Sequence, residues 1–260
     1  MPDENCTICG GTGWKILERG GLSGAELCEC SRTSRTAANK ENSRIPPKYQ
    51  HVSFDNFKIP QDNAHAREHL GQALLQVRGF VREYPAVDKP GLLLIGENGT
   101  GKTHLAVAAL KALLEKGYEG VFFDYASLLQ RITQSFDVAS GASLREAYRE
   151  ALEAPVLLLD ELGAYKMTEF VEDTITAIIT DRCNNGKTLI ATTNLPDPNV
   201  TGTIFQYNDP SRMKIARRTL AEVIGPRARS RLFEMCRVVQ MNATEDYRVK
   251  TGQVYPKPQK

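Results

Sequence analysis

Residues 96–103 have the types and spacing needed to hold the phosphates of a nucleotide. They fit the pattern G-x-x-x-x-G-K-[ST], in which glycines let the backbone curl so that successive N–H groups point at anionic oxygens. Lys102 can reach the β- and γ-phosphates, and the Thr103 hydroxyl can bind Mg²⁺. The residues that we expect to contact ATP in this segment are Gly96, Glu97, Asn98, Gly99, Thr100, Gly101, Lys102, Thr103 and His104.

Two carboxylates follow a later apolar run. Asp160 and Glu161 come directly after Val156 and three leucines. At the end of a strand, Asp160 can hold Mg²⁺ beside Thr103, directly or through water, and Glu161 can orient and deprotonate the attacking water. The alternative for both is a solvated strand end. Their position after a phosphate loop and one intervening strand favours the catalytic interpretation.

A polar side chain also ends the next apolar run, where Asn194 follows two threonines. Its amide can hydrogen-bond the attacking water and the γ-phosphate between the two neighbouring strands. The alternative is a turn residue before Leu195 and Pro196, because asparagine commonly starts turns. Together with the other motifs, the pattern favours the role at the γ-phosphate.

Four cysteines near the N-terminus form two tight pairs. They are Cys6, Cys9, Cys28 and Cys30. Paired thiolates suit tetrahedral Zn²⁺, and glycines after the first pair permit a sharp turn. The second pair is closer than the usual C-x₂-C, so free or redox-active thiols are the alternative. The isolated Cys183 and Cys236 are expected to be buried.

Two smaller groups of residues have open interpretations. His65 and His69 are four apart on an expected helix, which permits a metal pair, but a solvated helix face is favoured. Tyr49, Phe54 and Phe57 follow a double proline and either pack against the edge of a sheet or border an adenine pocket.

The elements that must position these residues alternate along the chain. We expect strands at 92–95, 120–124, 156–160 and 188–192, and helices at 62–83, 104–116, 126–135, 143–152 and 169–183. This alternation predicts an α/β fold of three layers, in which right-handed βαβ units build a parallel sheet with helices on both faces. Ligands of such sheets bind beyond the carboxyl ends of the strands.

The chain divides into a small N-terminal module and one larger domain. Residues 1–44 contain four of the six cysteines and a polar tail, read as a linker or a polar helix, and Pro46-Pro47 marks the boundary. We therefore expect a zinc module with a linker at 1–44 and an ATPase domain at 45–260. Residues 211–260 hold twelve Lys and Arg against four Asp and Glu, a local net charge of +8 within a total of +2. Such a run is either a solvated face or a contact with phosphates.

Composition excludes a membrane-spanning protein. Hydrophobic residues make up 41% of the chain, an ordinary value for a globular protein, and no apolar run approaches the roughly 20 residues of a membrane span. The acidic first residues do not resemble a signal peptide. We expect a cytoplasmic protein with reduced thiols and no membrane partner.

Together, the motifs at 96–103, 160–161, 193–194 and 230–232 resemble those of the AAA+ ATPases of the replication-initiator group, and especially the DnaC- and DnaI-like helicase loaders. Residues 45–57 resemble the segment that leads into that ATPase domain, and the cysteine pattern resembles the zinc module that precedes it. The resemblance implies ATP hydrolysis at interfaces between self-associated subunits, binding of single-stranded DNA, and a DnaB-like replicative DNA helicase as partner.

The same resemblance implies that an arginine completes the site of the neighbouring subunit. Arg231 is the matching position, and Arg227 and Arg229 are the alternatives. Residues 126–152 look like the helical insertion that tracks DNA. The chain departs from the family in the length of 196–226 and in the 28 residues after Leu232, too few for a full helical lid or an assigned sensor-2 arginine.

Two other functions compete with helicase loading. A transposition regulator of the IstB type shares the ATPase core, but we expect it to begin with a helical segment rather than a cysteine module. A non-enzymatic binding module with a vestigial nucleotide site is disfavoured, because Lys102, Asp160 and Glu161 are all present.

Overall fold

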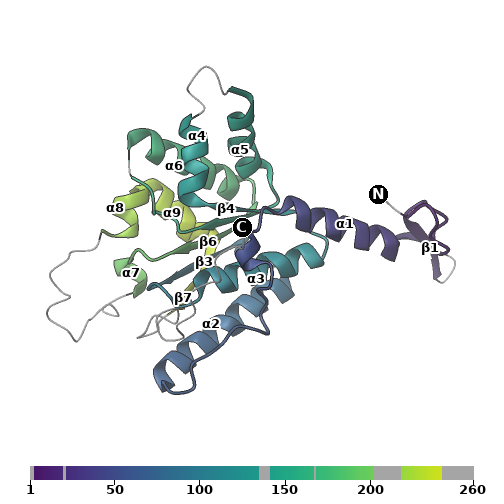
Figure 1. Ribbon diagram of the computed structural model, residues 1–260, viewed down its shortest axis with the longest axis horizontal. Coiled ribbons are helices and arrows are strands. Elements are labelled where there is room, and N and C mark those ends of the chain that lie inside the picture. Colours follow the sequence, from purple (N-terminus) through teal and green to yellow (C-terminus); the bar gives the residue numbers. More distant parts are fainter. Residues whose placement is uncertain (1–2, 20–21, 135–140, 167, 202–217, 242–260) are drawn as a thin grey trace, which may run out of the picture.

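The computed structural model describes residues 3–19, 22–134, 141–166, 168–201 and 218–241 (Figure 1). Most of the long 196–226 segment and the residues after Met241 lie outside these ranges. So do seven of the twelve Lys and Arg of residues 211–260: Arg212, Lys214, Arg217, Arg248, Lys250, Lys257 and Lys260.

The core is a parallel sheet of five strands in the order β4-β5-β6-β3-β7. Their bounds are β3 (Gly91–Gly96), β4 (Gly120–Asp124), β5 (Val156–Asp160), β6 (Thr188–Thr193) and β7 (Cys236–Met241). Every residue of β3, β5 and β6 is buried, as expected for central strands covered on both faces. The strand that precedes Asn194 therefore lies between the strand of the phosphate loop and the strand of Asp160.

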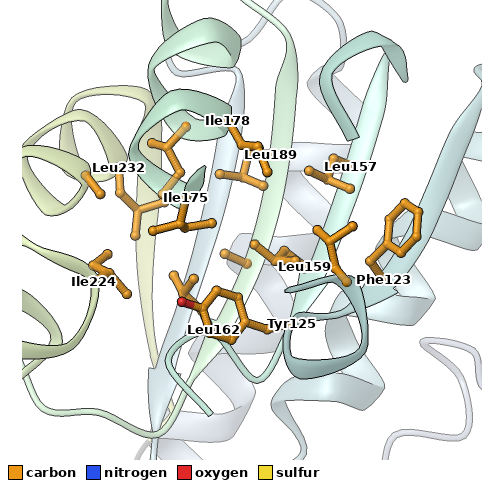
Figure 2. Packing of buried hydrophobic residues seen from close by; sticks show 14 of the residues in the cluster. Phe123, Tyr125, Leu157, Leu159, Leu162, Ile175, Ile178, Leu189, Ile224 and Leu232 are labelled. Carbon is orange, nitrogen blue, oxygen red and sulfur yellow. The ribbon is translucent and has the colours of Figure 1, made fainter. Parts of the chain in front are cut away.

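Helices cover both faces of the sheet (Figure 1). One face carries α2 (Ala64–Glu83) and α3 (Lys102–Glu115), and the other α4 (Tyr125–Gln134), α5 (Gly141–Glu153), α6 (Glu169–Asn184), α8 (Leu220–Ile224) and α9 (Pro226–Met235). Side chains alternate between the two cores: Leu93 and Ile95 face the second group, whereas Leu92 and Leu94 face the first. Figure 2 shows the second core, where Leu159, Ile175 and Leu232 meet. The predicted three-layer α/β fold is confirmed.

The fifth strand differs from the sequence prediction, which placed the last core strand at 188–192. β7 follows α9 directly and pairs with β3, with Leu93 opposite Val238. This contact leaves no space for a side chain at Gly91, where an added Cβ would lie 2.6 Å from the sulfur of Cys236. At Gly96 an added Cβ would collide with the carbonyl of Met241. The first glycine of the phosphate loop is therefore also required by strand packing.

The N-terminal residues form a hairpin and a helix. β1 (Trp14–Arg19) and β2 (Leu22–Leu27) pair antiparallel, α1 (Glu29–Asn42) follows, and a short 3₁₀ turn, η1 (Pro47–Tyr49), leads to α2. The hairpin lies at the end of α1 that points away from the sheet (Figure 1). The end of α1 nearest the sheet is docked: Asn39 donates to the carbonyl of Tyr118 at 3.1 Å, and the carbonyl of Ser43 accepts from the N–H of Phe122 at 2.8 Å. Among the described helices, none combines the length and apolar character needed to cross a membrane.

Candidate nucleotide-binding site

The phosphate loop joins β3 to the N-terminus of α3. Gly99 and Gly101 have positive φ angles of 75° and 88°, a region that glycine enters without steric cost. An added Cβ at Gly101 would lie 2.6 Å from the ring of Phe57. The first N–H groups of α3 have no partner within the helix, and the helix dipole adds positive potential there. The loop and helix therefore form an anion-binding site of the expected kind.

Lys102 is buried within this loop. Its ammonium donates to the carbonyl of Glu97 at 2.6 Å, and the Thr100 hydroxyl donates to the same carbonyl at 2.9 Å. A phosphate oxygen at the loop is the natural anionic replacement for that carbonyl as the partner of the ammonium.

Asp160 and Thr103, predicted as the magnesium ligands, lie together. The side chain of Asp160 is buried and accepts hydrogen bonds from the hydroxyls of Thr103 at 2.9 Å and Thr192 at 2.6 Å. Burial raises the pKa of Asp160, and the two hydroxyl donors oppose that shift. Carboxylate and hydroxyl oxygens are the donor set that Mg²⁺ takes in proteins. The residues present fit the ion.

Glu161 is exposed and occupies an unusual backbone conformation. Its φ of 57° lies in the left-handed region, and its N–H donates to the hydroxyl of Thr192 at 3.0 Å. The N–H of Leu162 also donates to the carbonyl of Thr192, at 2.8 Å. Thr192 therefore fixes both Asp160 and the turn that carries Glu161. This role of Thr192 was not predicted from the sequence, where the available signal was a hydroxyl inside an apolar strand.

Asn194, which follows β6, contacts the phosphate loop. Its amide donates to the side-chain oxygen of Asn98 at 3.1 Å. Because β6 lies between β3 and β5, the predicted phosphate, metal and water-activating residues meet at one edge of the sheet. This arrangement can bind a nucleoside triphosphate and activate a water at its γ-phosphate.

His104, on the first turn of α3, contacts the segment that precedes α2. The ring of His104 lies edge-on to that of Phe57, with 5.3 Å between centroids, and one ring nitrogen lies 2.9 Å from the carbonyl of Ser53. Burial lowers the pKa of His104. Tyr49, Phe54 and Phe57 pack against the core under α2 and α3. Packing is thus observed for all three, and Phe57 also borders the phosphate loop.

The three candidate arginines of α9 have different surroundings. Arg229 forms a bidentate ion pair with the buried Asp197, through Nε–Oδ2 at 2.6 Å and Nη2–Oδ1 at 2.7 Å. Arg231 is exposed and pairs with Glu234 of the same helix at 2.6 Å. Arg227 is exposed and forms no ion pair with any residue that the structure describes. The Asp197–Arg229 pair was not anticipated from the sequence.

The four N-terminal cysteines gather into one cluster. All four sulfur atoms lie within 4.8 Å of one another, with Cys6–Cys28 at 3.8 Å and Cys9–Cys30 at 3.5 Å. Zn–S bonds of about 2.3 Å in a tetrahedron place sulfur atoms about 3.8 Å apart, so the cluster fits zinc. Burial acts to raise the pKa of Cys9, but the N–H of Gly13 and the neighbouring thiols outweigh it and bring the pKa to about 7. Cys236 is buried and Cys183 half-buried.

The histidine pair is not part of such a cluster. His65 and His69 stack edge-on with 4.2 Å between ring centroids. Within the described residues, the cysteines alone form a group of three or more side chains suited to a metal.

The strand order, with β6 between the strands of the phosphate loop and of Asp160, defines an AAA+ ATPase domain. The chain belongs to the family described as IstB-like ATP binding protein, whose model matches residues 80–253. It is 27% identical over 182 residues to the replicative helicase loader DnaC of Escherichia coli K12, covering 68% of this chain and 70% of that protein. It is 26% identical over 176 residues to the replicative helicase loader DnaI of Bacillus subtilis, covering 66% and 55%. A crystal structure of the DnaC helicase loader aligns with a TM-score of 0.59 at 30% identity, covering 76% of this chain and 100% of that one. The resemblance drawn from the motifs is confirmed.

Proposed function

We propose that this protein is a magnesium-dependent ATPase that recruits or loads a DnaB-like replicative DNA helicase onto single-stranded DNA. The observation that carries the proposal is the meeting of Thr103, Asp160, Glu161 and Asn194 at one sheet edge, in a chain similar to proteins named replicative helicase loaders.

Each residue at that edge has a separate task in hydrolysis. Lys102 binds the β- and γ-phosphate oxygens, and Thr103 with Asp160 holds Mg²⁺, which neutralises charge on the phosphates. Glu161 takes the proton of the attacking water. Asn194 orients that water and the γ-phosphate.

Hydrolysis is completed between subunits. Arg231 reaches the nucleotide of the neighbouring subunit, where its guanidinium stabilises the charge that develops on the γ-phosphate. Its exposure on the outer side of α9 supports this role. Arg229 is engaged by Asp197 in its own chain, so Arg227 is the alternative.

The N-terminal module, residues 1–44, binds zinc through Cys6, Cys9, Cys28 and Cys30 and holds the helicase, while residues 45–260 form the ATPase domain. Single-stranded DNA is contacted by the helices between 126 and 152 and by the basic C-terminal region. The docking of Asn39 and Ser43 on the ATPase core gives the module a fixed point of attachment.

Mixing of two variants tests the trans arrangement. Arg231→Ala supplies an intact Glu161, and Glu161→Gln supplies an intact Arg231. Alone, Glu161→Gln should lower turnover by roughly 10²- to 10⁴-fold and Arg231→Ala by roughly 10³- to 10⁵-fold, while both variants still bind ATP. DNA-stimulated ATPase activity should recover on mixing, and an absence of recovery in assemblies that contain both chains would refute action in trans.

The family match also favours a second candidate, a transposition regulator of the IstB type. The two functions differ in what deletion of residues 1–44 does. For a loader, the truncated chain should keep ATP binding and lose helicase binding in a pull-down assay. If the full chain fails to bind a replicative helicase and instead stimulates a transposase, the loader proposal is wrong.

A further inference from the structure

The ion pair between Asp197 and Arg229 connects the segment after β6, which contains Asn194, to α9, which carries Arg231. Asp197 lies three residues beyond Asn194, and its side chain is fully buried. Arg229 lies two residues before Arg231 on α9. The segment from Asn194 to Asp197 therefore contacts the phosphate loop at one end, through Asn98, and the arginine helix at the other.

The geometry of the pair makes this connection stiff. Arg229 presents its planar guanidinium to both carboxylate oxygens, and Asp197 Oδ1 also accepts from the N–H of Asn199 at 3.1 Å. The same guanidinium stacks on the ring of Phe233, 4.5 Å from its centroid. A bidentate, charge-assisted contact fixes orientation as well as distance, and separating it would leave a buried carboxylate without its cation.

The pair also fixes the roll of α9 about its own axis. Successive residues of an α-helix are about 100° apart, so Arg229 and Arg231 point to nearly opposite sides. Arg229 is held inward by Asp197, and Arg231 is exposed. The helix begins at Pro226, directly after Gly225, whose φ of 82° is accessible to glycine at little cost, and it ends directly in β7.

We propose that the Asp197–Arg229 pair is a positioning element that ties the γ-phosphate-contacting end of β6 to the orientation of α9, and thereby directs Arg231 toward the nucleotide of the neighbouring subunit. The inference rests on the proposed action of Arg231 in trans. A change at Asn194 in one subunit is transmitted through residues 194–197 to α9, and reaches the next subunit as a change in the position of Arg231.

Such a residue has a distinctive phenotype in mixed assemblies. An Arg229→Lys chain keeps its own loop, Asp160 and Glu161, so it can still hydrolyse ATP, but it loses the fork that directs its own Arg231. On its own it should retain wild-type ATP affinity and lose roughly 10- to 100-fold in kcat, the range expected for a misplaced catalytic group.

Mixing separates positioning from a general structural role. With Glu161→Gln, which carries an intact α9, Arg229→Lys should recover DNA-stimulated activity. With Arg231→Ala it should not, because both chains then lack a correctly placed arginine. Asp197→Asn keeps the shape of the side chain and should give the same pattern of recovery as Arg229→Lys. If Arg229→Lys binds ATP poorly, Asp197→Asn takes its place in the mixing experiment.

The matched control is Arg78→Lys. Arg78, on α2, also forms an arginine–aspartate pair, with Asp55 at 2.6 Å, and its guanidinium also lies over a phenylalanine ring; its substitution should leave kcat unchanged. If Arg231→Ala recovers with Glu161→Gln but Arg229→Lys and Asp197→Asn do not, the positioning role is wrong and trans action stands. If Arg231→Ala itself does not recover, the trans arrangement fails and the positioning role fails with it.

Discussion

Thr192 offers the sharpest test of the site geometry, because one hydroxyl contacts two residues of the proposed site. It donates to Asp160 at 2.6 Å and accepts from the N–H of Glu161 at 3.0 Å. In Thr192→Val a methyl group replaces the hydroxyl, while the β-branched shape that suits a strand is kept. The substitution removes both hydrogen bonds and adds almost no volume.

The expected loss follows from the kind of bonds removed. A hydrogen bond to a charged group contributes about 1.5–3 kcal/mol, which corresponds to a fall in kcat of roughly 10- to 100-fold if the loss is felt in the transition state. The pH dependence should also move. Burial raises the pKa of Asp160 and the Thr192 hydroxyl opposes that rise, so its removal raises the pKa further. Because the ionised carboxylate is the form that binds Mg²⁺, the acidic limb of the rate profile should shift to higher pH.

The assay is steady-state ATP hydrolysis with excess Mg²⁺ across a range of pH, with Thr188→Val as the control. Thr188 is a buried threonine at the other end of the same strand, and its hydroxyl contacts that of Tyr84 at 3.0 Å. An unchanged kcat and acidic limb in Thr192→Val, or equal effects in both variants, would refute the reasoning.

Three further predictions follow from the described residues. Asp160→Asn should abolish hydrolysis yet raise the melting temperature of the nucleotide-free protein. Burial raises the pKa of Asp160, so folding disfavours its charged form. The gain in melting temperature measured by calorimetry should therefore shrink as the pH falls and Asp160 becomes protonated. Gly163→Ala should lower the melting temperature more than Gly117→Ala. The backbone strain is similar in the two variants, because φ is 93° at Gly163 and 90° at Gly117, but of the two only the Cβ at residue 163 collides with Leu195. Elemental analysis should find one zinc per chain, and Cys28→Ser should reduce it.

The central strands were predictable because their apolar runs are continuous. β3, β4, β5 and β6 fall within about a residue of the predicted ranges, since strands buried on both faces need apolar side chains at every position. β7 was missed for the opposite reason: Arg237 and Gln240 interrupt its apolar residues, and no turn separates it from α9. The β1–β2 hairpin was not predicted from the sequence either, because its hydrophobic residues Trp14 and Ile16 are exposed and do not form part of a core.

The same contrast holds for the site. Lys102, Thr103, Asp160 and Asn194 belong to motifs whose chemistry can be read from residue type and spacing, and contacts of the described chain bring them together. The contribution of Thr192 depends on which strand lies beside β5, which the sequence does not state. The Asp197–Arg229 pair joins residues far apart in the chain, and depends on how α9 packs, so no local pattern could have revealed it.

The docking of α1 turns the N-terminal arm into a lever. Its fulcrum is the contact of Asn39 with the carbonyl of Tyr118, reinforced by the contact of Ser43 with β4 and the ion pair of Arg44 with Glu150 of α5 at 2.6 Å. At about 1.5 Å per residue, the stretch from Glu29 to Asn39 spans about 15 Å, with the cysteine cluster at its outer end. A tilt of about 10° at the fulcrum would move that end by about 2.6 Å. Small adjustments of β4 and α5 would thus appear as a larger displacement of the cysteine cluster.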